Sequence, residues 1–231
     1  MPISPRIFTI AAVALLAGAA APAAGAAPTG IYAQQAELAA ADGATNDSFG
    51  SSVAVSGDTL VVGAPVKHGA DDSAGAAYVY ERPASGSWAD AKQVAKLTLS
   101  GGRASGTLGH VAISGDTIVA GVGDQRVGTH EQQGAVFVFV RPTGGWADAH
   151  ETAVLTASDG ATSDVLGSGV ALSGDTVVAG AEGKKVGDKE RQGAAYVFVK
   201  PATGWKNGVQ TAELAASSGA TGDGAGNAVA I

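Results

Sequence analysis

The chain has 231 residues, of which 35 are glycine and 8 are proline, and 45% of its residues are hydrophobic. So many chain-breaking residues exclude a fold built of long helices, and so many hydrophobic residues exclude a disordered chain. The net charge of −7, from 14 basic and 21 acidic residues, argues against nucleic-acid binding, and the absence of cysteine excludes disulfides, thiolate metal sites and a cysteine nucleophile.

Residues 1–26 have the features of a signal peptide. Arg6 gives a positive start, the apolar run from Ile7 to Ala21 is short for a membrane span, and Ala24-Gly25-Ala26 is a cleavage site of the A-x-A type. We expect cleavage after Ala26, no membrane span in the mature chain, and a secreted location that is extracellular, periplasmic or on the cell surface. An uncleaved membrane anchor is the alternative. Residues 27–36 then form an N-terminal lead-in.

An internal repeat follows the lead-in. The tripeptide Ser-Gly-Asp occurs at 56–58, 114–116 and 173–175, and a tryptophan follows each occurrence, at Trp88, Trp146 and Trp205. Aligning these landmarks divides the chain into units 37–95, 96–153 and 154–212, with a partial fourth unit at 213–231. A repeat of this length is typical of stacked, equivalent structural units such as propeller blades.

Each unit is predicted to contain four short strands. In the first unit these are residues 52–55, 59–62, 76–82 and 93–99, with Ser56-Gly57-Asp58 as a tight turn and Pro83 ending the third strand. Four antiparallel strands every 58 or 59 residues predict an all-β fold, a β-propeller of four-stranded blades with three blades and a partial fourth. The recurring tryptophans are expected to pack between blades, and stacking on sugars is the alternative.

The first unit resembles the FG-GAP repeat of integrin alpha-chain propellers and of secreted bacterial repeat proteins. The resemblance rests on Phe49-Gly50 followed by Gly63-Ala64-Pro65. Weaker versions in the next two units are Leu108-Gly109 with Ala120-Gly121, and Leu166-Gly167 with Ala179-Gly180. The resemblance implies a seven-bladed β-propeller used for ligand binding and adhesion.

The chain departs from that family in two ways. The acidic calcium-binding insertion expected between the first two strands is replaced by Ser-Gly-Asp, which offers too few oxygens for calcium. In addition, residues 229–231 align with the middle of a first strand, so the fourth blade is incomplete, although 35–39 resembles an outermost strand. We therefore expect either a fragment of a longer protein, which we favour, or self-association through open blade edges.

The sequence contains no constellation of catalytic residues. His68, His110, His130 and His150 do not recur at equivalent repeat positions, and no nucleophile elbow, HExxH motif or phosphate-binding glycine loop is present. No pair of carboxylates has a spacing that implies acid–base chemistry. We therefore predict that the protein is not an enzyme.

A recurring acidic loop is the candidate metal site. Asp42 and Asp47 flank one copy of it, and Asp159 and Asp164 flank another. Carboxylates five residues apart in a loop could share a weakly bound calcium ion with backbone carbonyls. The alternative is an Asx-type turn in which Asp47 and Asp164 accept backbone N–H groups at a blade junction. No other cofactor is expected.

The loops between the second and third strands vary most from unit to unit and are the candidate ligand-binding loops. They span 66–74, 123–133 and 183–192, and polar loops on a rigid scaffold are common binding sites in repeat proteins. Solvated loops without a ligand are the alternative. The candidate residues are His68, Asp71, Asp72, Arg126, His130, Glu131, Lys184, Lys185 and Arg191.

Two functions are consistent with these features. The first is an exported, non-catalytic propeller module that binds a protein or a glycan. The second is the propeller portion of a larger secreted hydrolase whose catalytic domain lies beyond Ile231.

Overall fold

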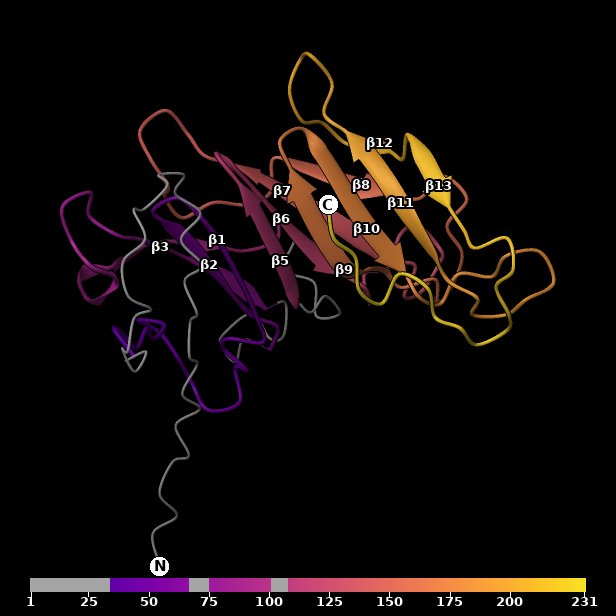
Figure 1. Ribbon diagram of the computed structural model, residues 1–231, viewed down its shortest axis with the longest axis horizontal. Helices are drawn as coiled ribbons and strands as arrows, with labels where there is room; N and C mark the ends of the chain where they lie inside the picture. Colours follow the sequence, from indigo (N-terminus) through magenta and orange to yellow (C-terminus); the bar gives the residue numbers. More distant parts are fainter. Residues whose placement is uncertain (1–33, 67–74, 101–107) are drawn as a thin grey trace, which may run out of the picture.

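The computed structural model describes residues 34–66, 75–100 and 108–231, so the predicted signal peptide lies outside the described residues. Within these ranges the chain forms strands and one turn of 3-10 helix (Figure 1). The elements are β1 (Ser52–Ser56), β2 (Thr59–Ala64), β3 (Ala76–Glu81), η1 (Trp88–Asp90), β4 (Lys92–Leu97), β5 (His110–Ser114), β6 (Thr117–Val122), β7 (Ala135–Val140), β8 (Ala153–Thr156), β9 (Leu166–Ser173), β10 (Thr176–Ala181), β11 (Ala194–Val199), β12 (Gly208–Val209) and β13 (Ala212–Leu214).

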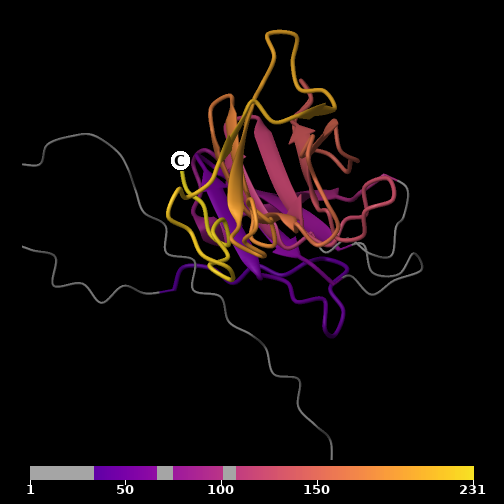
Figure 2. The ribbon, with the colours of Figure 1, turned by 90° about the vertical axis from the view of Figure 1, so that its right-hand side faces the viewer.

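The strands form three sheets, one for each predicted unit. Blade 1 has the order β1-β2-β3-β4, blade 2 contains β5-β6-β7-β8, and blade 3 has the order β9-β10-β11-β13. Neighbouring strands of each blade are antiparallel. The first strands β1, β5 and β9 contact one another in turn, and the blades follow one another in a row (Figures 1 and 2). The prediction of an all-β fold with propeller-type blades is confirmed.

The Ser-Gly-Asp tripeptides make the tight turns that the sequence predicts. Ser56 pairs with Thr59 across the first turn, and Gly57 has a φ of 59°. This left-handed conformation favours glycine because a Cβ atom would be strained there. Gly115 and Gly174 repeat it with φ values of 55° and 53°.

The hydrophobic core lies between the blades. Val61 belongs to the cluster between blades 1 and 2, whereas its neighbours Leu60 and Val62 belong to a cluster on the opposite face of blade 1. This alternation is the two-residue period of a strand buried on both faces. A third cluster fills the space between blades 2 and 3 and includes Tyr196, which is fully buried.

Four details differ from the predicted strands. The fourth strand of blade 1 ends at Leu97, two residues early, and neither residues 35–39 nor residues 229–231 form a strand. Instead, Leu38 and Ala40 lie outside regular secondary structure and pack against the cluster that contains Leu60 and Val62. The short strand β12, which was not predicted, joins the sheet of blade 2 by pairing in parallel with β8.

The described residues include no helix that is long and apolar enough to cross a membrane.

Candidate functional site

The loops that precede the first strands and the loops that join the second and third strands lie on one face of the row of blades, here called the loop face. Their backbones are hydrogen-bonded to each other across the blade joints. Residues 131–133 accept hydrogen bonds from residues 163, 165 and 166, at 2.9–3.0 Å. Residues 190–192 accept equivalent bonds from residues 222, 224 and 225, at 2.9–3.0 Å. The loop face is therefore held in a defined conformation by the blades on either side.

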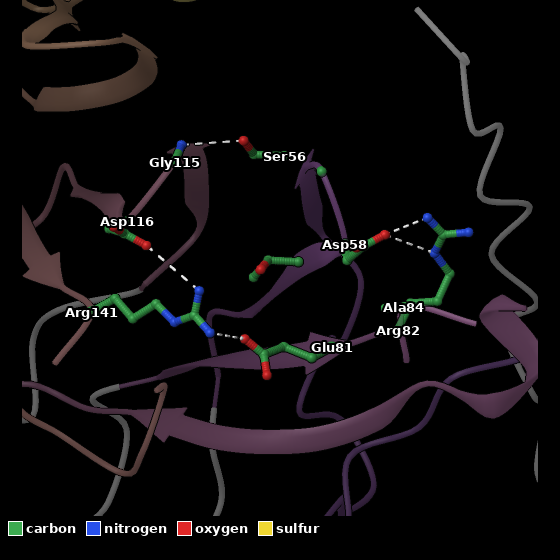
Figure 3. Close-up of a pocket in the computed structure, with 10 residues that line it drawn as sticks. Ser56, Asp58, Glu81, Arg82, Ala84, Gly115, Asp116 and Arg141 are labelled. Atoms are coloured by element: carbon green, nitrogen blue, oxygen red, sulfur yellow. Dashed lines mark hydrogen bonds and ion pairs between the residues drawn. The ribbon is translucent and has the colours of Figure 1, made fainter. Parts of the chain in front are cut away.

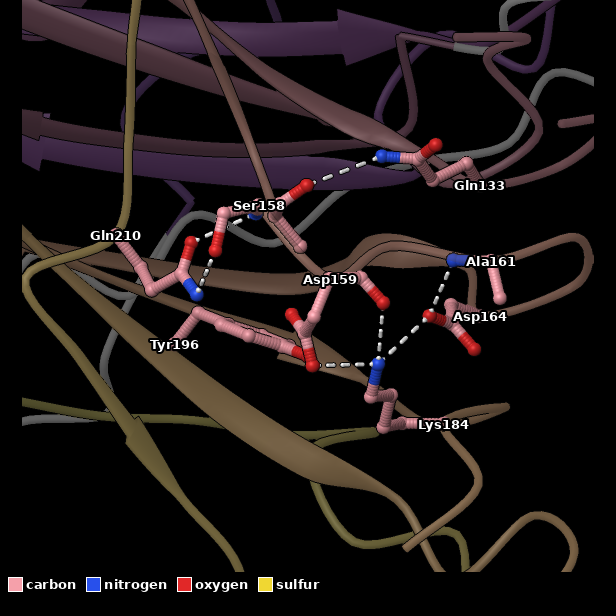
Figure 4. Close-up of polar contacts among 9 residues, drawn as sticks. Gln133, Ser158, Asp159, Ala161, Asp164, Lys184, Tyr196 and Gln210 are labelled. Atoms are coloured by element: carbon pink, nitrogen blue, oxygen red, sulfur yellow. Dashed lines mark hydrogen bonds and ion pairs between the residues drawn. The ribbon is translucent and has the colours of Figure 1, made fainter. Parts of the chain in front are cut away.

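A buried lysine is the centre of the polar cluster on this face (Figure 4). The Nζ atom of Lys184 lies 2.8 Å from Oδ2 of Asp159 and 2.8 Å from the Asp159 carbonyl oxygen. It also lies 3.3 Å from Oδ2 of Asp164. Tyr196 donates a hydrogen bond of 3.1 Å to Oδ1 of Asp159. Lys184 is thus the internal partner of two carboxylates rather than an exposed ligand-binding residue, which corrects its place among the candidate loop residues.

The cluster shifts the pKa values of its members. Burial opposes the ionisation of Asp159, but the hydrogen bonds and charge of Lys184 outweigh it, so the pKa of Asp159 is lowered. Burial likewise opposes the charge on Lys184, but its two carboxylate partners outweigh it, and the pKa of Lys184 is raised. The pKa of Tyr196 is also raised, first by burial and then by the negative charge of Asp159. The ion pair is therefore charged over a wide range of pH.

The first copy of the acidic loop has a related but more open arrangement. Asp42 accepts a hydrogen bond of 2.7 Å from the hydroxyl of Tyr78 and forms an ion pair of 2.6 Å with Lys96. Burial, followed by the hydrogen bond to Asp42, raises the pKa of Tyr78. In the second unit glycine replaces this aspartate and Phe137 replaces the tyrosine, so the two members of the hydrogen bond change together.

The second aspartate of each acidic loop closes a tight turn. Asp47 accepts a hydrogen bond of 2.8 Å from the backbone N–H of Ala44, and Asp164 accepts one of 2.8 Å from Ala161. Asp223 repeats the contact with Ala220 at 2.7 Å. Each aspartate accepts from the residue three positions before it, whereas in an Asx-type turn it would accept from a residue two positions after it. The predicted acceptance of a backbone N–H is therefore present, but the turn is not of the Asx type. In the part of the chain that the structure describes, no three His, Asp or Glu side chains are grouped so that they could hold a metal ion.

The other candidate loop residues are exposed on the loop face. Arg126 pairs with Glu131 at 3.2 Å, and Lys185 pairs with Glu190. The exposed candidates are Arg126, His130, Glu131, Lys185 and Arg191, whereas His68, Asp71 and Asp72 lie outside the described residues. The two described loops have matching turns. Each is closed by an isolated antiparallel bridge, between residues 127 and 130 in the first loop and between residues 186 and 189 in the second.

The opposite face carries a polar hollow of about 420 Å³ that the sequence analysis did not single out (Figure 3). Arg82 pairs with Asp58 of its own blade, and Arg141 bridges Asp116 at 3.6 Å and Glu81 of the preceding blade at 3.0 Å. The sequence does indicate these ion pairs, because a basic residue follows the third strand in every unit. All the charged groups that line the hollow are paired with one another, so it offers no free charge to a ligand.

The tryptophans behave as core residues in the two complete joints. Trp146 belongs to the cluster between blades 1 and 2, and Trp205 to the cluster between blades 2 and 3. Both are buried, whereas Trp88 is partly buried against the outer cluster of blade 1 with Arg82 stacked 5.6 Å from its ring centroid. The buried rings pack between blades, as predicted, and are not available as platforms for sugar.

Comparison with known proteins supports the resemblance seen in the sequence. A family model for the FG-GAP repeat matches residues 32–80 and residues 150–198. The first stretch runs from the lead-in into β3 of blade 1, and the second runs from the end of blade 2 into β11 of blade 3. Both matched stretches carry an acidic loop that ends in Asp47 or Asp164. No curated protein matches the chain.

Proposed function

We propose that this chain, which is an FG-GAP repeat protein, is an exported, non-catalytic binding module that takes a protein or glycan ligand on its loop face. FG-GAP repeats and propeller-type blades make an interaction module.

One observation carries the proposal: exposed charged side chains stand on loops whose backbones are already ordered. Arg126, His130 and Glu131 belong to one loop, and Lys185 and Arg191 belong to the next. The hydrogen bonds from residues 163–166 and 222–225 hold both loops in place. A surface that is ordered before binding loses less conformational entropy when a ligand arrives.

The arrangement favours binding over catalysis. His130 is exposed, and its backbone pairs with Val127 to close the turn of its loop. Lys184, Asp159 and Asp164 pair with one another, so their charges are committed to holding the loops together. An interaction module needs a rigid frame with varied side chains, which this face provides.

The test is a binding screen of the full chain against a glycan array and, separately, against surface and matrix proteins. The variant Arg126→Ala/Arg191→Ala should lower the affinity for any ligand found, and Lys206→Ala, an exposed basic residue in the loop between β11 and β12, is the matched control. Binding that both variants leave unchanged would show that the loop face is not the site. The absence of any saturable ligand would contradict the proposed function itself.

A further inference from the structure

Two side chains of blade 1 face blade 2 inside the polar hollow. Thr59 of β2 pairs directly with Glu81 of β3, and both residues line the hollow. Two residues further along, Val61 pairs with Val79, and both belong to the cluster between blades 1 and 2. Side chains two residues apart in a strand share a face. Thr59 and Glu81 therefore continue the face that packs against blade 2 and end it in a polar pair.

The hydroxyl of Thr59 is free although the residue is buried. Thr59 is 8% exposed, and no described residue exchanges a hydrogen bond with its side chain. A buried hydroxyl without a partner lowers the stability of a protein. Since Thr59 lines the hollow, a molecule bound there would supply a partner for this hydroxyl.

Glu81 offers a second free atom on the same face. Its Oε1 forms the ion pair of 3.0 Å with Arg141 of blade 2, and Oε2 has no partner among the residues that the structure describes. A hydroxyl both donates and accepts hydrogen bonds, whereas a carboxylate oxygen only accepts. The directly paired Thr59 and Glu81 therefore present a donor and an acceptor side by side, which matches two adjacent hydroxyl groups of a ligand.

The two blades hold the sides of the hollow in place. Oγ of Ser56 accepts a hydrogen bond of 3.2 Å from the N–H of Gly115, and the ion pair of Glu81 with Arg141 crosses the same joint (Figure 3). Nothing lies within 4 Å of a Cβ atom built on Gly57 or Gly115, so the backbone of both turns is open to a ligand. A site that is fixed before binding loses little conformational entropy when it is filled.

The next joint keeps the threonine but not the carboxylate. Thr117 stands at the position of Thr59, and it pairs with Val140. Lys200, the residue after β11, pairs with Asp175 of its own blade. Of the two described joints, the one between blades 1 and 2 thus combines the free hydroxyl with a carboxylate, and the other serves as an internal control.

The lining of the hollow favours a neutral ligand that is rich in hydroxyl groups. Its charged groups are three carboxylates and two guanidinium groups, which pair with one another and leave one net negative charge: Asp58, Glu81, Asp116, Arg82 and Arg141. An anion would be repelled by this charge. Of the described residues that line the hollow, Ala84 is the only one with an apolar side chain, so an apolar ligand would find little surface. The volume of about 420 Å³ lies within the range of small-molecule sites, about 300–1,000 Å³.

We propose that the polar hollow is a second binding site and that it takes a neutral carbohydrate. One hydroxyl group of the sugar would donate to Oε2 of Glu81, and an adjacent one would accept from the hydroxyl of Thr59. The hollow lies on the face opposite the loop face, so this inference goes beyond the proposed function and succeeds or fails independently of it.

The probes are the neutral trisaccharides maltotriose, cellotriose and mannotriose, with trigalacturonic acid as their charged counterpart. Each is titrated into the full chain labelled with ¹⁵N. We expect at least one neutral trisaccharide to shift the amide signals of Thr59 and Gly115 saturably, while that of Gly174, in the equivalent turn of the next joint, stays in place. Trigalacturonic acid should bind more weakly, because the hollow has a net negative charge.

The variant Thr59→Val separates binding from folding. Valine is similar in size to threonine but has no hydroxyl, so the affinity for the trisaccharide should fall at least about fivefold. The midpoint of urea unfolding should be unchanged or higher, because the hydroxyl that is removed has no partner within the described protein. Thr117→Val is the matched control in the next joint and should bind like the unaltered chain. Glu81→Val, which copies Val140, should also weaken binding.

Four results would overturn the inference. The first is that no neutral trisaccharide shifts the amides of Thr59 and Gly115, and the second is an unaltered affinity in Thr59→Val. The third is tighter binding of trigalacturonic acid than of the neutral sugars. The fourth is loss of the sugar in the loop-face variant Arg126→Ala/Arg191→Ala, because the sugar would then bind on the loop face, which would leave the proposed function standing.

Discussion

Gly121 and Gly167 lie against each other across the joint between blades 2 and 3. A Cβ atom added to Gly121 would stand 2.1 Å from the carbonyl oxygen of Gly167, which itself has a φ of 95°. Gly180 and Gly226 repeat the contact at 1.7 Å. The glycine that ends the FG half of the motif thus packs against the glycine in the GAP half of the preceding unit. The two halves therefore meet between blades as well as within blade 1, where the N–H of Gly50 donates a hydrogen bond of 2.9 Å to the Gly63 carbonyl.

Gly121→Ala should therefore destabilise the protein. The new methyl group has no space between two backbones, and overpacking of this kind costs about 1–3 kcal/mol. Gly144→Ala is the matched control, because nothing lies within 4 Å of a Cβ atom there, and we expect it to stay within about 0.5 kcal/mol of the unaltered chain. Urea unfolding of both variants measures the difference. Equal stabilities would show that the joint can open to admit the methyl group.

Removal of the Lys184 ammonium should destabilise blade 3. Lys184→Met leaves the buried carboxylate of Asp164 without its cation, and the loss of one partner of a buried pair costs about 3 kcal/mol. Lys185→Met is the control, since its pair with Glu190 is exposed and is worth less than about 1 kcal/mol. Thermal unfolding compares the two variants. A Lys185 variant as unstable as the Lys184 variant would contradict a special role for the buried pair.

The ion pair of Lys184 with Asp159 should make stability depend on pH at both extremes. The pKa of Asp159 is lowered from its ordinary value of 3.8, so its contribution is present above pH 3.8 and is lost as the pH falls through the lowered value. The pKa of Lys184 is raised from 10.5, so its contribution is present below pH 10.5 and is lost as the pH rises through the raised value. The Tm difference between the unaltered chain and Lys184→Met should be constant between these limits and shrink outside them. A difference that changes near neutral pH would point to another titrating group.

Removal of calcium should leave the fold unchanged. The Lys184 ammonium sits between the carboxylates of Asp159 and Asp164, and Lys96 pairs with Asp42, so lysines already stand beside three of the four candidate metal-ligating residues. We expect the same Tm with EDTA as with added calcium. A lower Tm in EDTA, with magnesium unable to restore it, would instead support a calcium site at the acidic loops.

The sequence alone was enough to predict the blades. Valines and aromatic residues recur on a period of 58 or 59 residues, and the turns Ser56-Gly57-Asp58 and their repeats bound strands whose residues alternate between faces. These are local properties, because glycine conformation and strand alternation depend on the immediate chain. The turns closed by Asp47 and Asp164 are local in the same sense, since each aspartate accepts from a backbone N–H only three residues earlier.

Only the tertiary structure decided how the blades are joined and which polar residues are free. Polarity placed Lys184 among the exposed candidates, but Asp159, 25 residues earlier in the chain, folds back to bury it. Side-chain oxygens of blades 2 and 3 accept backbone hydrogen bonds from residues 51 to 53 positions earlier, such as Asp148 from Lys96, and nothing local to either residue indicates the other. The physical reason is that a hydrogen-bond donor or acceptor is visible in a sequence, but whether it is satisfied depends on groups that the fold brings from elsewhere.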